Sequence, residues 1–327
     1  MSEFLYGLNQ KVGPAPKIKK LGAIKRGMEQ TPVMFNGVPV IVESIEPDEK
    51  VNKQYIRVRN LKTNEVSEPF GENCYFASGF VDGDTLYAFA TSTRDDKALT
   101  MYQSENQTEW HDPRGGHTVK MFSTKDLKNW EEKDIINCPD RRMWNTSVCK
   151  GGDKYVIAIE VCAEEGFDIP EIGEPFTSFF AESKDLVNWK MMPDKCSYTK
   201  ERYNACPVLR YANGYYYMIC LERLPACRYA PYIYRTQNFE HWEVGLHNPI
   251  MMFSDEDRIP KDGVVFSADD YELLQTGLNI NCSDLDLFEY EGKTHIYYAN
   301  GDQMTYSFLC EALYDGPLDE FLEAFFK

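Results

Sequence analysis

One eight-residue motif recurs along this chain and constrains its fold more than any other feature. Residues 123–130 read STKDLKNW, residues 182–189 read ESKDLVNW, and residues 235–242, RTQNFEHW, form a degraded third copy. The tryptophans that end the copies therefore recur about every 55 residues, a spacing typical of arrays of similar supersecondary units. Ser-Lys-Asp-Leu predicts a tight turn held by its Ser and Asp side chains, while Leu and Trp fold back as an apolar plug between neighbouring sheets. We assign the motif this structural role and no catalytic one.

A second recurring element consists of two β-rich runs joined by a turn that contains glycine. Its copies span residues 78–91, 146–160, 206–222 and 283–300, with turn glycines Gly83, Gly152, Gly214 and Gly292. Asp-Gly and Asn-Gly between β-rich runs indicate hairpins, because these residues tolerate the positive φ that the turn requires. A fifth hairpin is predicted over residues 32–44, turning at Asn36-Gly37, with residues 54–61 as a further strand.

Five such units predict an all-β protein, a five-bladed β-propeller in which the eight-residue motif links the third and fourth strands of a blade. The last strand run, residues 304–313, is expected to close the ring by pairing with the N-terminal segment, which removes exposed sheet edges. We expect residues 1–30 to be an N-terminal extension and residues 31–327 to form a single propeller domain. Residues 316–326, GPLDEFLEAFF, predict a short C-terminal helix on the outside.

Composition limits the partners and the compartment. Hydrophobic residues make up 43% of the chain, enough for a large core, and the formal net charge of −17 opposes binding to nucleic acid or to an anionic membrane. The chain shows no apolar run of the length of a signal peptide or a membrane span. Its ten cysteines stand singly in apolar runs without a C-x-x-C pair, which predicts buried free thiols and a cytoplasmic location.

The long connections are expected on one face of the propeller. The glycine turns and the motif turns are short, whereas residues 92–118, 161–177, 223–231 and 244–279 are long segments between strands. Long loops on one face of a rigid scaffold usually carry the function.

Counting from the turn glycines predicts which residues reach this face. Eight residues after each glycine stand Thr91, Glu160, Glu222 and Asn300, and eight residues before it stand Tyr75, Trp144, Cys206 and Asp284. Glu160 and Glu222 end apolar strands, where desolvation favours a raised carboxyl pKa in one of them, as a general acid requires. Asp284 and Asp286 share one face of a strand, with Asp284 expected at the rim and Asp286 deeper. We therefore select Asp284, Glu160 and Glu222 as the candidate catalytic residues.

Polar and aromatic residues near the same rim are candidates for binding a substrate. Asn side chains both donate and accept hydrogen bonds, as the hydroxyls of a sugar require, and loop cations suit an anionic sugar or phosphate. Alternatively, Asn caps strand ends, loop arginines pair with nearby acids, and an inward Trp belongs to the core. The candidate substrate-binding residues are Asn73, Asn145, Asn204, Asn281, Trp144, Arg114, His117 and Arg223.

The repeated Ser-Lys-Asp-Leu-x-x-Trp pattern and strand-turn-strand units such as CPVLRYANGYYYM, spread over residues 31–311, resemble the five-bladed β-propeller glycoside hydrolases, the superfamily that includes families 43, 32, 117 and 130. Family 43 members resemble one another in an Asp base on the first blade, an Asp on the second that orients substrate, and a Glu acid on the third. Here the W-A-P-D pattern of the second blade is represented by residues 144–147, WNTS, and the E-G-P pattern of the third by residues 205–207, ACP. Neither acid stands at its matching position, so the resemblance implies only the fold and a carbohydrate substrate.

The leading hypothesis is an exo-acting glycoside hydrolase for plant- or microbe-derived oligosaccharides. Asp284 would activate water, while Glu160 or Glu222 protonates the leaving oxygen and the other positions both. The inverting course usual in the superfamily implies an acid and a base roughly 6.5 to 9.5 Å apart. Two alternatives stay open: a glycoside phosphorylase, as in family 130, and a non-catalytic carbohydrate-binding propeller, which the missing family acids favour.

We expect no metal and no cofactor. The five histidines show no zinc-ligand spacing on a predicted element. His295 either approaches the channel, where some relatives place calcium, or belongs to the core. The sequence is also compatible with a homo-oligomer.

Overall fold

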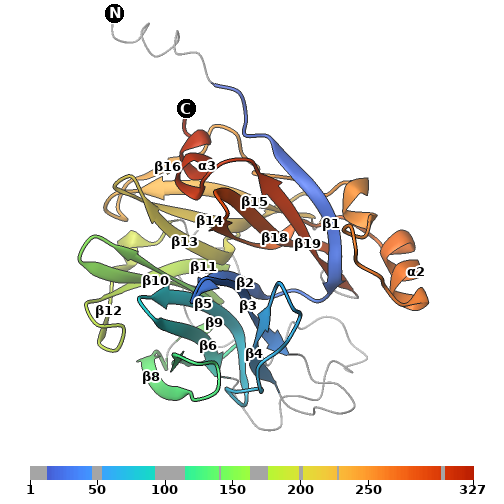
Figure 1. The fold of residues 1–327 in the computed structure, drawn as a ribbon. Helices are drawn as coiled ribbons and strands as arrows, with labels where there is room; N and C mark the ends of the chain where they lie inside the picture. The colour runs from blue at the N-terminus through green and yellow to red at the C-terminus, as the bar shows by residue number, and fades with distance from the viewer. Residues whose placement is uncertain are drawn as a thin grey trace, which may run out of the picture.

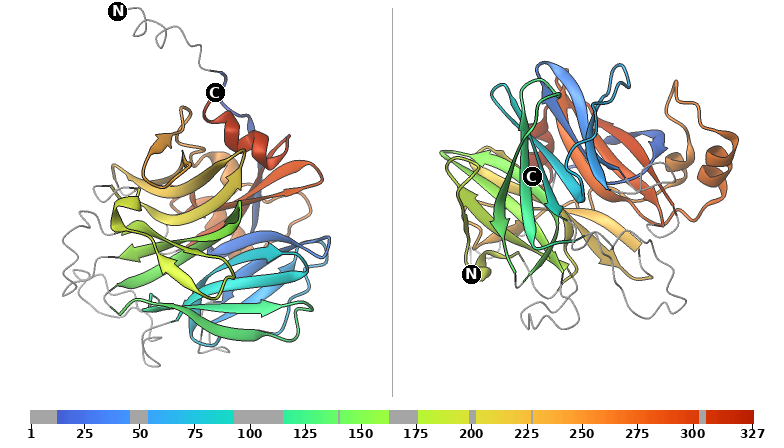
Figure 2. Two further views of the ribbon diagram at one scale, coloured as in Figure 1. Left: turned by 90° about the vertical axis from the view of Figure 1, so that its left-hand side faces the viewer. Right: turned by 90° about the horizontal axis from the view of Figure 1, so that it is seen from below.

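Five β-sheets surround a central axis in the computed structural model (Figure 1). It describes residues 13–45, 54–92, 115–139, 141–162, 176–198, 202–226, 228–302 and 306–327. The first strand of each sheet packs against the first strands of its two neighbours, so the sheets follow one another around the ring in sequence order (Figure 2). The predicted all-β, five-bladed β-propeller is confirmed.

We number the sheets I to V in sequence order. Sheets I and II contain β2 (Gln30–Phe35), β3 (Val38–Ile45) and β4 (Tyr55–Asn60), then β5 (Cys74–Asp82), β6 (Thr85–Ser92), β7 (Thr118–Thr124) and β8 (Glu131–Asn137). Sheet III contains β9 (Arg142–Gly151), β10 (Lys154–Cys162), β11 (Phe176–Ser183) and β12 (Trp189–Met191). Sheet IV contains β13 (Ala205–Ala212), β14 (Tyr215–Leu224), β15 (Arg228–Thr236) and β16 (Trp242–Val244). Sheet V contains β17 (Ser283–Tyr290), β18 (Lys293–Gly301), β19 (Ser307–Tyr314) and, as its outer strand, β1 (Ile18–Arg26).

The ring is closed by strands from the two ends of the polypeptide, as predicted. β1 pairs with β19 in an antiparallel ladder that runs from Ile18 opposite Tyr314 to Arg26 opposite Phe308. The strand that closes the ring nevertheless lies within residues 1–30, which the sequence analysis assigned to an extension. An outer strand is partly exposed to solvent, so it can contain many lysines, as the run IKKLGAIKR does. This composition is why the sequence did not indicate a strand there. Residues 1–12 lie outside the described part of the chain.

All five predicted hairpin turns are present. Positive φ occurs at the turn residues Asn36, Gly37, Gly83, Gly152, Asn213, Gly214, Glu291 and Gly292. Where two consecutive residues have positive φ, the twist of the turn matches the twist of the strands that it joins.

The eight-residue motif forms the same turn in each of its copies, between the third and fourth strands of sheets II, III and IV. In the first two copies the Asp126 and Asp185 carboxylates each accept two backbone N–H groups, at 2.8 to 3.0 Å. In the third copy the Asn238 side chain accepts the same pair of bonds. The motif therefore has the structural role predicted for it.

The motif tryptophans fill the spaces between sheets. Trp130 stacks on Phe70 with ring centroids 3.6 Å apart, in the core between sheets I and II. Trp189 packs in the core between sheets II and III, and Trp242 stacks on Phe180 between sheets III and IV. Each copy of the motif thus joins its own sheet to the preceding one.

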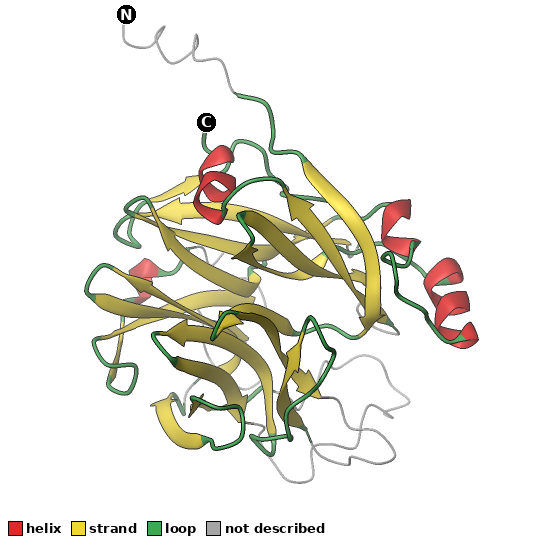
Figure 3. Ribbon diagram, in the orientation of Figure 1, coloured by secondary structure: helices red, strands yellow, loops and turns green. Residues whose placement is uncertain are grey.

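Among the described residues, helices are few and lie at the periphery (Figure 3). They are α2 (Ala268–Thr276), α3 (Leu318–Ala324) and the 3₁₀ turns η1 (Asp194–Cys196) and η2 (Asp255–Arg258). α3 is the predicted C-terminal helix and buries Phe321 and Leu322 against sheet V. α2 was not predicted, although Ser267 caps it by accepting the N–H of Asp270 and the sequence SADD shows this signal. In the described part of the chain, none of the helices combines the length and the apolar character of a membrane span.

The seam between sheets V and I depends on charge more than the other seams do. Its apolar cluster has only four fully buried members, Ile41, Phe288, Tyr297 and Leu309. Beside it, the Glu43 side chain of β3 is 1% exposed and pairs with Lys25 of β1 and with Arg57 and Arg59 of β4. Burial opposes its ionisation, but these three cations hold the pKa of Glu43 at about 2.

Replacing Glu43 should weaken the ring at this seam. Glu43→Gln leaves three cations around a neutral side chain, and breaking a buried charge group of this kind costs about 3–5 kcal/mol in the free energy of unfolding. Because the pKa of Glu43 is lowered on folding, its contribution is complete above pH 4.5 and is lost as pH falls through about 2. Urea denaturation at pH 7 and pH 3 measures both effects.

The matched control is Glu132→Gln, which removes an ion pair to Lys120 whose Glu132 side chain is half exposed. An exposed pair of this kind contributes less than about 1 kcal/mol. Equal losses for the two variants would show that Glu43 has no special role at the seam.

Candidate active site

The inner strands of sheets II to V each contain a β-bulge close to their first residues. The register shifts between Tyr75 and Ser78 in β5, between Ala205 and Val208 in β13, and between Ser283 and Asp286 in β17. In β9 the shift lies opposite residues 159–161 of β10. Side chains along a regular strand point alternately to its two faces, and a bulge changes the direction of one of them. Because the bulges occur at the same position in four inner strands, they redirect side chains at the same height along the propeller axis.

Four residues at this level have a left-handed backbone. They are Glu29 (φ 62°), Phe76 (φ 54°), Cys206 (φ 50°) and Asp284 (φ 47°). Each stands six residues before the residue of its inner strand that pairs last before the hairpin turn. Asn145 of β9 occupies the corresponding position in sheet III. Non-glycine residues adopt this conformation at a cost of about 1–3 kcal/mol, and such residues gather at functional sites.

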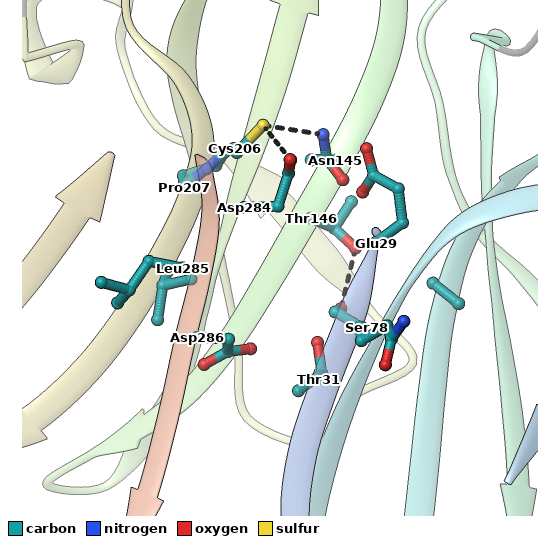
Figure 4. A pocket seen from close by; sticks show the side chains of 13 residues that line it. Glu29, Thr31, Ser78, Asn145, Thr146, Cys206, Pro207, Asp284, Leu285 and Asp286 are labelled. Carbon is teal, nitrogen blue, oxygen red and sulfur yellow. Dashed lines mark hydrogen bonds between the residues drawn. The ribbon is translucent and has the colours of Figure 1, made fainter. Parts of the chain in front are cut away.

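Side chains from this level line a pocket at the mouth of the channel (Figure 4). Glu29, Asn145, Cys206 and Asp284 face one another across it. The rest of the lining consists of Gln30, Thr31, Ala77, Ser78, Thr146, Pro207, Val208, Leu285 and Asp286.

Hydrogen bonds connect two of the predicted catalytic acids through Cys206. The Cys206 thiol donates to Asp284 Oδ1 at 3.0 Å, and the Cys206 backbone N–H donates to Glu160 Oε2 at 2.7 Å. Asn145 Nδ2 donates to the same Glu160 oxygen at 3.1 Å and approaches Cys206 Sγ at 3.4 Å. The structure therefore brings Glu160 and Asp284 to opposite sides of one residue.

Burial and nearby carboxylates keep the Cys206 thiol protonated. Burial, and then the charges of Asp284, Glu160 and Glu29, raise the pKa of the Cys206 thiol well above its usual range. The thiol is therefore protonated at neutral pH and acts as a hydrogen-bond donor. Asp284 and Glu160 are bonded to Cys206, and Glu29, just before sheet I, lines the same pocket.

The third predicted acid, Glu222, lies in an adjacent set of contacts between sheets III and IV. Its side chain is buried, and Arg202 and the Tyr234 hydroxyl donate to it. Burial raises the pKa of Glu222 in spite of the Arg202 charge. Burial raises the pKa of the Cys220 thiol, and so do Glu222 and Glu160. The Cys220 thiol therefore lies between the contacts of Glu222 and those of Glu160.

Beneath the mouth, Asp286 forms an ion pair with Arg210 of the neighbouring sheet. Asp286 is 4% exposed, whereas Asp284 is partly exposed, which agrees with the expected order of depth. Burial raises the pKa of Asp286 against the opposing charge of Arg210.

The four predicted asparagines do not gather at one rim. Asn145 lines the pocket. Asn204 is fully buried, accepts a bond from Ser178 of sheet III at 2.7 Å and approaches Cys220, while Asn281 is fully buried and accepts the N–H of Tyr229 in sheet IV at 2.9 Å. Asn73 is partly exposed and its N–H donates to the carbonyl of Gln54. Asn204 and Asn281 therefore connect neighbouring sheets through their side chains, and Asn73 does so through its backbone N–H.

The other predicted binding residues are also distributed. Trp144 is 4% exposed and packs against Phe76, Phe176 and the Arg142 guanidinium, so it belongs to the core. His117 is held by the carbonyls of Cys138 and Arg141, at 3.2 and 2.9 Å.

Arg223 is the exception, because it is exposed and its guanidinium lies 5.6 Å from the ring centre of Tyr203. Burial raises the pKa of Tyr203, and so do the nearby Glu160 and Asp284 charges. The predicted long segment at residues 223–231 is instead a hairpin of β14 and β15. Arg114 lies outside the described residues.

Glu29 was missed in the sequence, although a signal was present. Gly37 is the turn glycine of the first hairpin, and the count of eight residues that selected Cys206 and Asp284 gives Glu29 there. In sheets II and III the glycine is the first residue of the two-residue turn, whereas in the other sheets it is the second. Counting eight residues back from it therefore reaches Tyr75 and Trp144, one position before the equivalent residues Phe76 and Asn145.

Ligands for a metal do not gather anywhere in the described part of the chain, where groups of three or more His, Cys, Asp or Glu side chains in a suitable arrangement are absent. His295, considered for a calcium site, lies within sheet V, and its Nδ1 is 2.7 Å from Glu311 Oε1. Eight of the cysteines are seen as free thiols, and six of these eight are buried.

Comparison with other proteins gives similarity of structure only. No protein-family model and no curated protein sequence matches the chain. The protein BT0996, solved as an RGII complex, is 11% identical, with 97% of this chain and 96% of its own length covered and a TM-score of 0.57. A family 43 glycoside hydrolase of Bacillus licheniformis, BlXynB, is 13% identical over 87% of this chain and 51% of its own, with a TM-score of 0.53. The Bombyx mori family 32 β-fructofuranosidase BmSUC1 is 13% identical over 94% and 64%, with a TM-score of 0.50.

These similarities establish the fold. The chain has the five-bladed propeller fold found in glycoside hydrolases of families 43 and 32. It spans about half the length of the Bacillus licheniformis protein.

The raised pKa of Glu222 predicts how stability depends on pH. Because folding raises this pKa, the contribution of Glu222 is complete below pH 4.5 and is lost as pH rises through the pKa of the folded state. The stability of the wild type relative to Glu222→Gln should therefore fall as pH rises from 4 to 8. Thermal unfolding of both proteins across this range measures the difference.

Glu182→Gln is the control with the opposite sign. Lys154 lowers the pKa of Glu182, so the wild type should gain stability relative to this variant as pH rises through 4.5. A difference for Glu222→Gln that does not change with pH would contradict the raised pKa.

Proposed function

We propose that this protein is a glycoside hydrolase that works by carboxylate acid and base catalysis. The observation that carries the proposal is the meeting of Glu29, Glu160 and Asp284, from three different sheets, around Cys206 at the mouth of the channel. Glycosidic bonds are cleaved by pairs of carboxyl groups on either side of the bond. The fold shared with hydrolases of families 43 and 32 supports the same class by analogy.

The contacts suggest a division of roles. Asp284 lines the pocket and is our candidate for the base that activates water. Glu160 accepts two N–H groups through one oxygen, and bonds of this kind favour the ionised carboxylate, which suits a positioning role. Glu222 has the raised pKa that a proton donor needs. Glu29 shares the pocket with Asp284 and is the second candidate for the base.

The pocket supports an exo-acting enzyme for oligosaccharides of plant or microbial origin. Its lining continues down to Asp286, which is buried in its ion pair with Arg210. We propose that the terminal unit of an oligosaccharide occupies this pocket. The exposed Arg223 beside Tyr203 suits a sugar with a carboxylate at this position, because guanidinium and carboxylate form paired hydrogen bonds. The free thiols are consistent with a reducing compartment such as the cytoplasm.

The test is a panel of aryl glycosides and oligosaccharides, with neutral and uronic sugars, assayed with and without inorganic phosphate. We expect release of reducing sugar from one class of substrate without phosphate. Asp284→Asn and Glu222→Gln should each lower kcat by about 10²–10⁴-fold, the usual contribution of a general acid or base. Glu29→Gln compares the second candidate for the base with Asp284.

Glu289→Gln is the matched control, since Glu289 lies on the same strand as Asp284 but is exposed at its far end. Its kcat should equal that of the wild type. Turnover only in the presence of phosphate would identify a phosphorylase instead. Binding of an oligosaccharide with no turnover, and with affinity unchanged by Asp284→Asn, would identify a non-catalytic binding propeller.

A further inference from the structure

Cys206 contacts both carboxylates that the proposed reaction needs near the pocket. Its thiol donates to Asp284 Oδ1 at 3.0 Å, and its backbone N–H donates to Glu160 Oε2 at 2.7 Å. Asn145 completes the arrangement, because its amide donates to the same Glu160 oxygen and lies 3.4 Å from Cys206 Sγ. One residue thus holds acids from sheets III and V.

The backbone explains how one residue reaches both sides. Cys206 is the first residue of the β13 bulge and has a φ of +50°, and Pro207 follows it. The bulge breaks the regular alternation, so the N–H of Cys206 is released from the β13–β14 ladder and points to Glu160. Asp284 occupies the same place in its own strand, with a φ of +47°, and therefore meets the thiol side by side.

The surroundings of Asp284 make a donor important. Titratable and charged groups surround Asp284 from four sheets. Glu29 lies just before sheet I, Glu160 on sheet III, and Cys206 on sheet IV, with Tyr203 just before it. Cys282 precedes the strand of Asp284, and Asp286 on that strand is paired with Arg210. Three of these neighbours, Glu29, Glu160 and Asp286, are carboxyl groups, and the charge of Asp286 is opposed by Arg210. A nearby like charge disfavours ionisation. A hydrogen bond donated to Asp284 acts in the opposite direction.

We propose that Cys206 is a positioning residue, which orients Asp284 through its thiol and Glu160 through its backbone N–H, and so keeps Asp284 ionised between two other carboxylates. This inference rests on the proposed function, since it assigns a task within the same site. The thiol is suited to it because burial and the nearby carboxylates keep it protonated, and therefore a donor, across the neutral pH range. The Asn145 amide is the second part of the arrangement.

The test compares Cys206→Ala with Cys206→Ser, which differ by a single oxygen. The Ala variant lacks the donor, and a hydrogen bond to a charged group is commonly equivalent to about tenfold or more in a rate or equilibrium. We expect kcat to fall at least about tenfold and the acid limb of the pH–activity profile to move upward by about one pH unit, since the ionised form of Asp284 loses its donor. The Ser variant should restore the position of the acid limb.

Cys138→Ala removes a thiol outside this cluster and should leave kcat and the profile unchanged. An acid limb that stays at the wild-type pH in Cys206→Ala, or a Ser variant that behaves as the Ala variant does, would overturn the positioning role while the proposed function stands.

A second measurement does not require activity. Urea denaturation of Cys206→Ala, Asp284→Asn and the double variant forms a double-mutant cycle, and we expect the two substitutions to be non-additive. If the wild type hydrolyses no glycoside in the panel, the proposed function fails, and the cycle still decides whether Cys206 and Asp284 are coupled. Additive effects would overturn the coupling.

Discussion

A ring of sheets persists only if its last sheet is fixed to its first, and here that seam has the smallest apolar cluster of the ring. Two features compensate. The β1–β19 ladder makes the N-terminal strand part of sheet V, and the buried Glu43 carboxylate of sheet I binds Lys25 on that same strand. The three seams between sheets I and IV are joined by aromatic plugs from the eight-residue motif, which bury apolar surface without requiring charged partners. The pocket depends on this closure, because Glu29 immediately precedes β2 at the seam and Asp284 lies on sheet V.

The bulges connect the fold to its chemistry. A regular inner strand presents alternate side chains to its two neighbouring sheets, and such side chains are needed for packing. The bulges of β9, β13 and β17 turn Asn145, Cys206 and Asp284 into the pocket at the same level, and Glu29, just before β2, reaches it with a left-handed backbone. The corresponding residue of β5, Phe76, stays in an aromatic cluster. Of the acids at the ends of second strands, Glu160 accepts the N–H of Cys206 at this level, whereas Glu222 is bonded to Tyr234 and Arg202 outside the pocket lining. The proposed site therefore draws on acids near the starts of first strands and at the ends of second strands.

The fold was readable from the sequence because its signals are local. Asn-Gly and Asp-Gly turns and the Asp126 and Asp185 turns depend on a few adjacent residues, so the number of sheets followed from counting them. The site was less readable. A bulge leaves no local signature in ordinary residues, so it could not be predicted. The turn glycine is also one position earlier in sheets II and III than in the other sheets, and counting back from it therefore selected Trp144 where Asn145 lines the pocket. Asn204 and Asn281 were expected at a surface, but strand ends in a closed ring meet the neighbouring sheet, so both serve as buried links. The contribution of β1 was hidden because an outer strand rich in lysine and arginine has the composition of a tail.

The closing ladder also bears on how the protein reaches its native state. Ile18 is paired with Tyr314, so the contact that completes the ring joins nearly opposite ends of the polypeptide. During synthesis β1 emerges before the other described strands and its partner β19 after them, and until then sheet I has no neighbour on one side and the strand has no ladder to join. Contacts between distant segments must overcome the largest loss of conformational entropy, so ring closure is expected to be the late and slow event in folding. Before ring closure, the lysines of β1 oppose its pairing with the exposed sheet edges of other, incompletely folded chains.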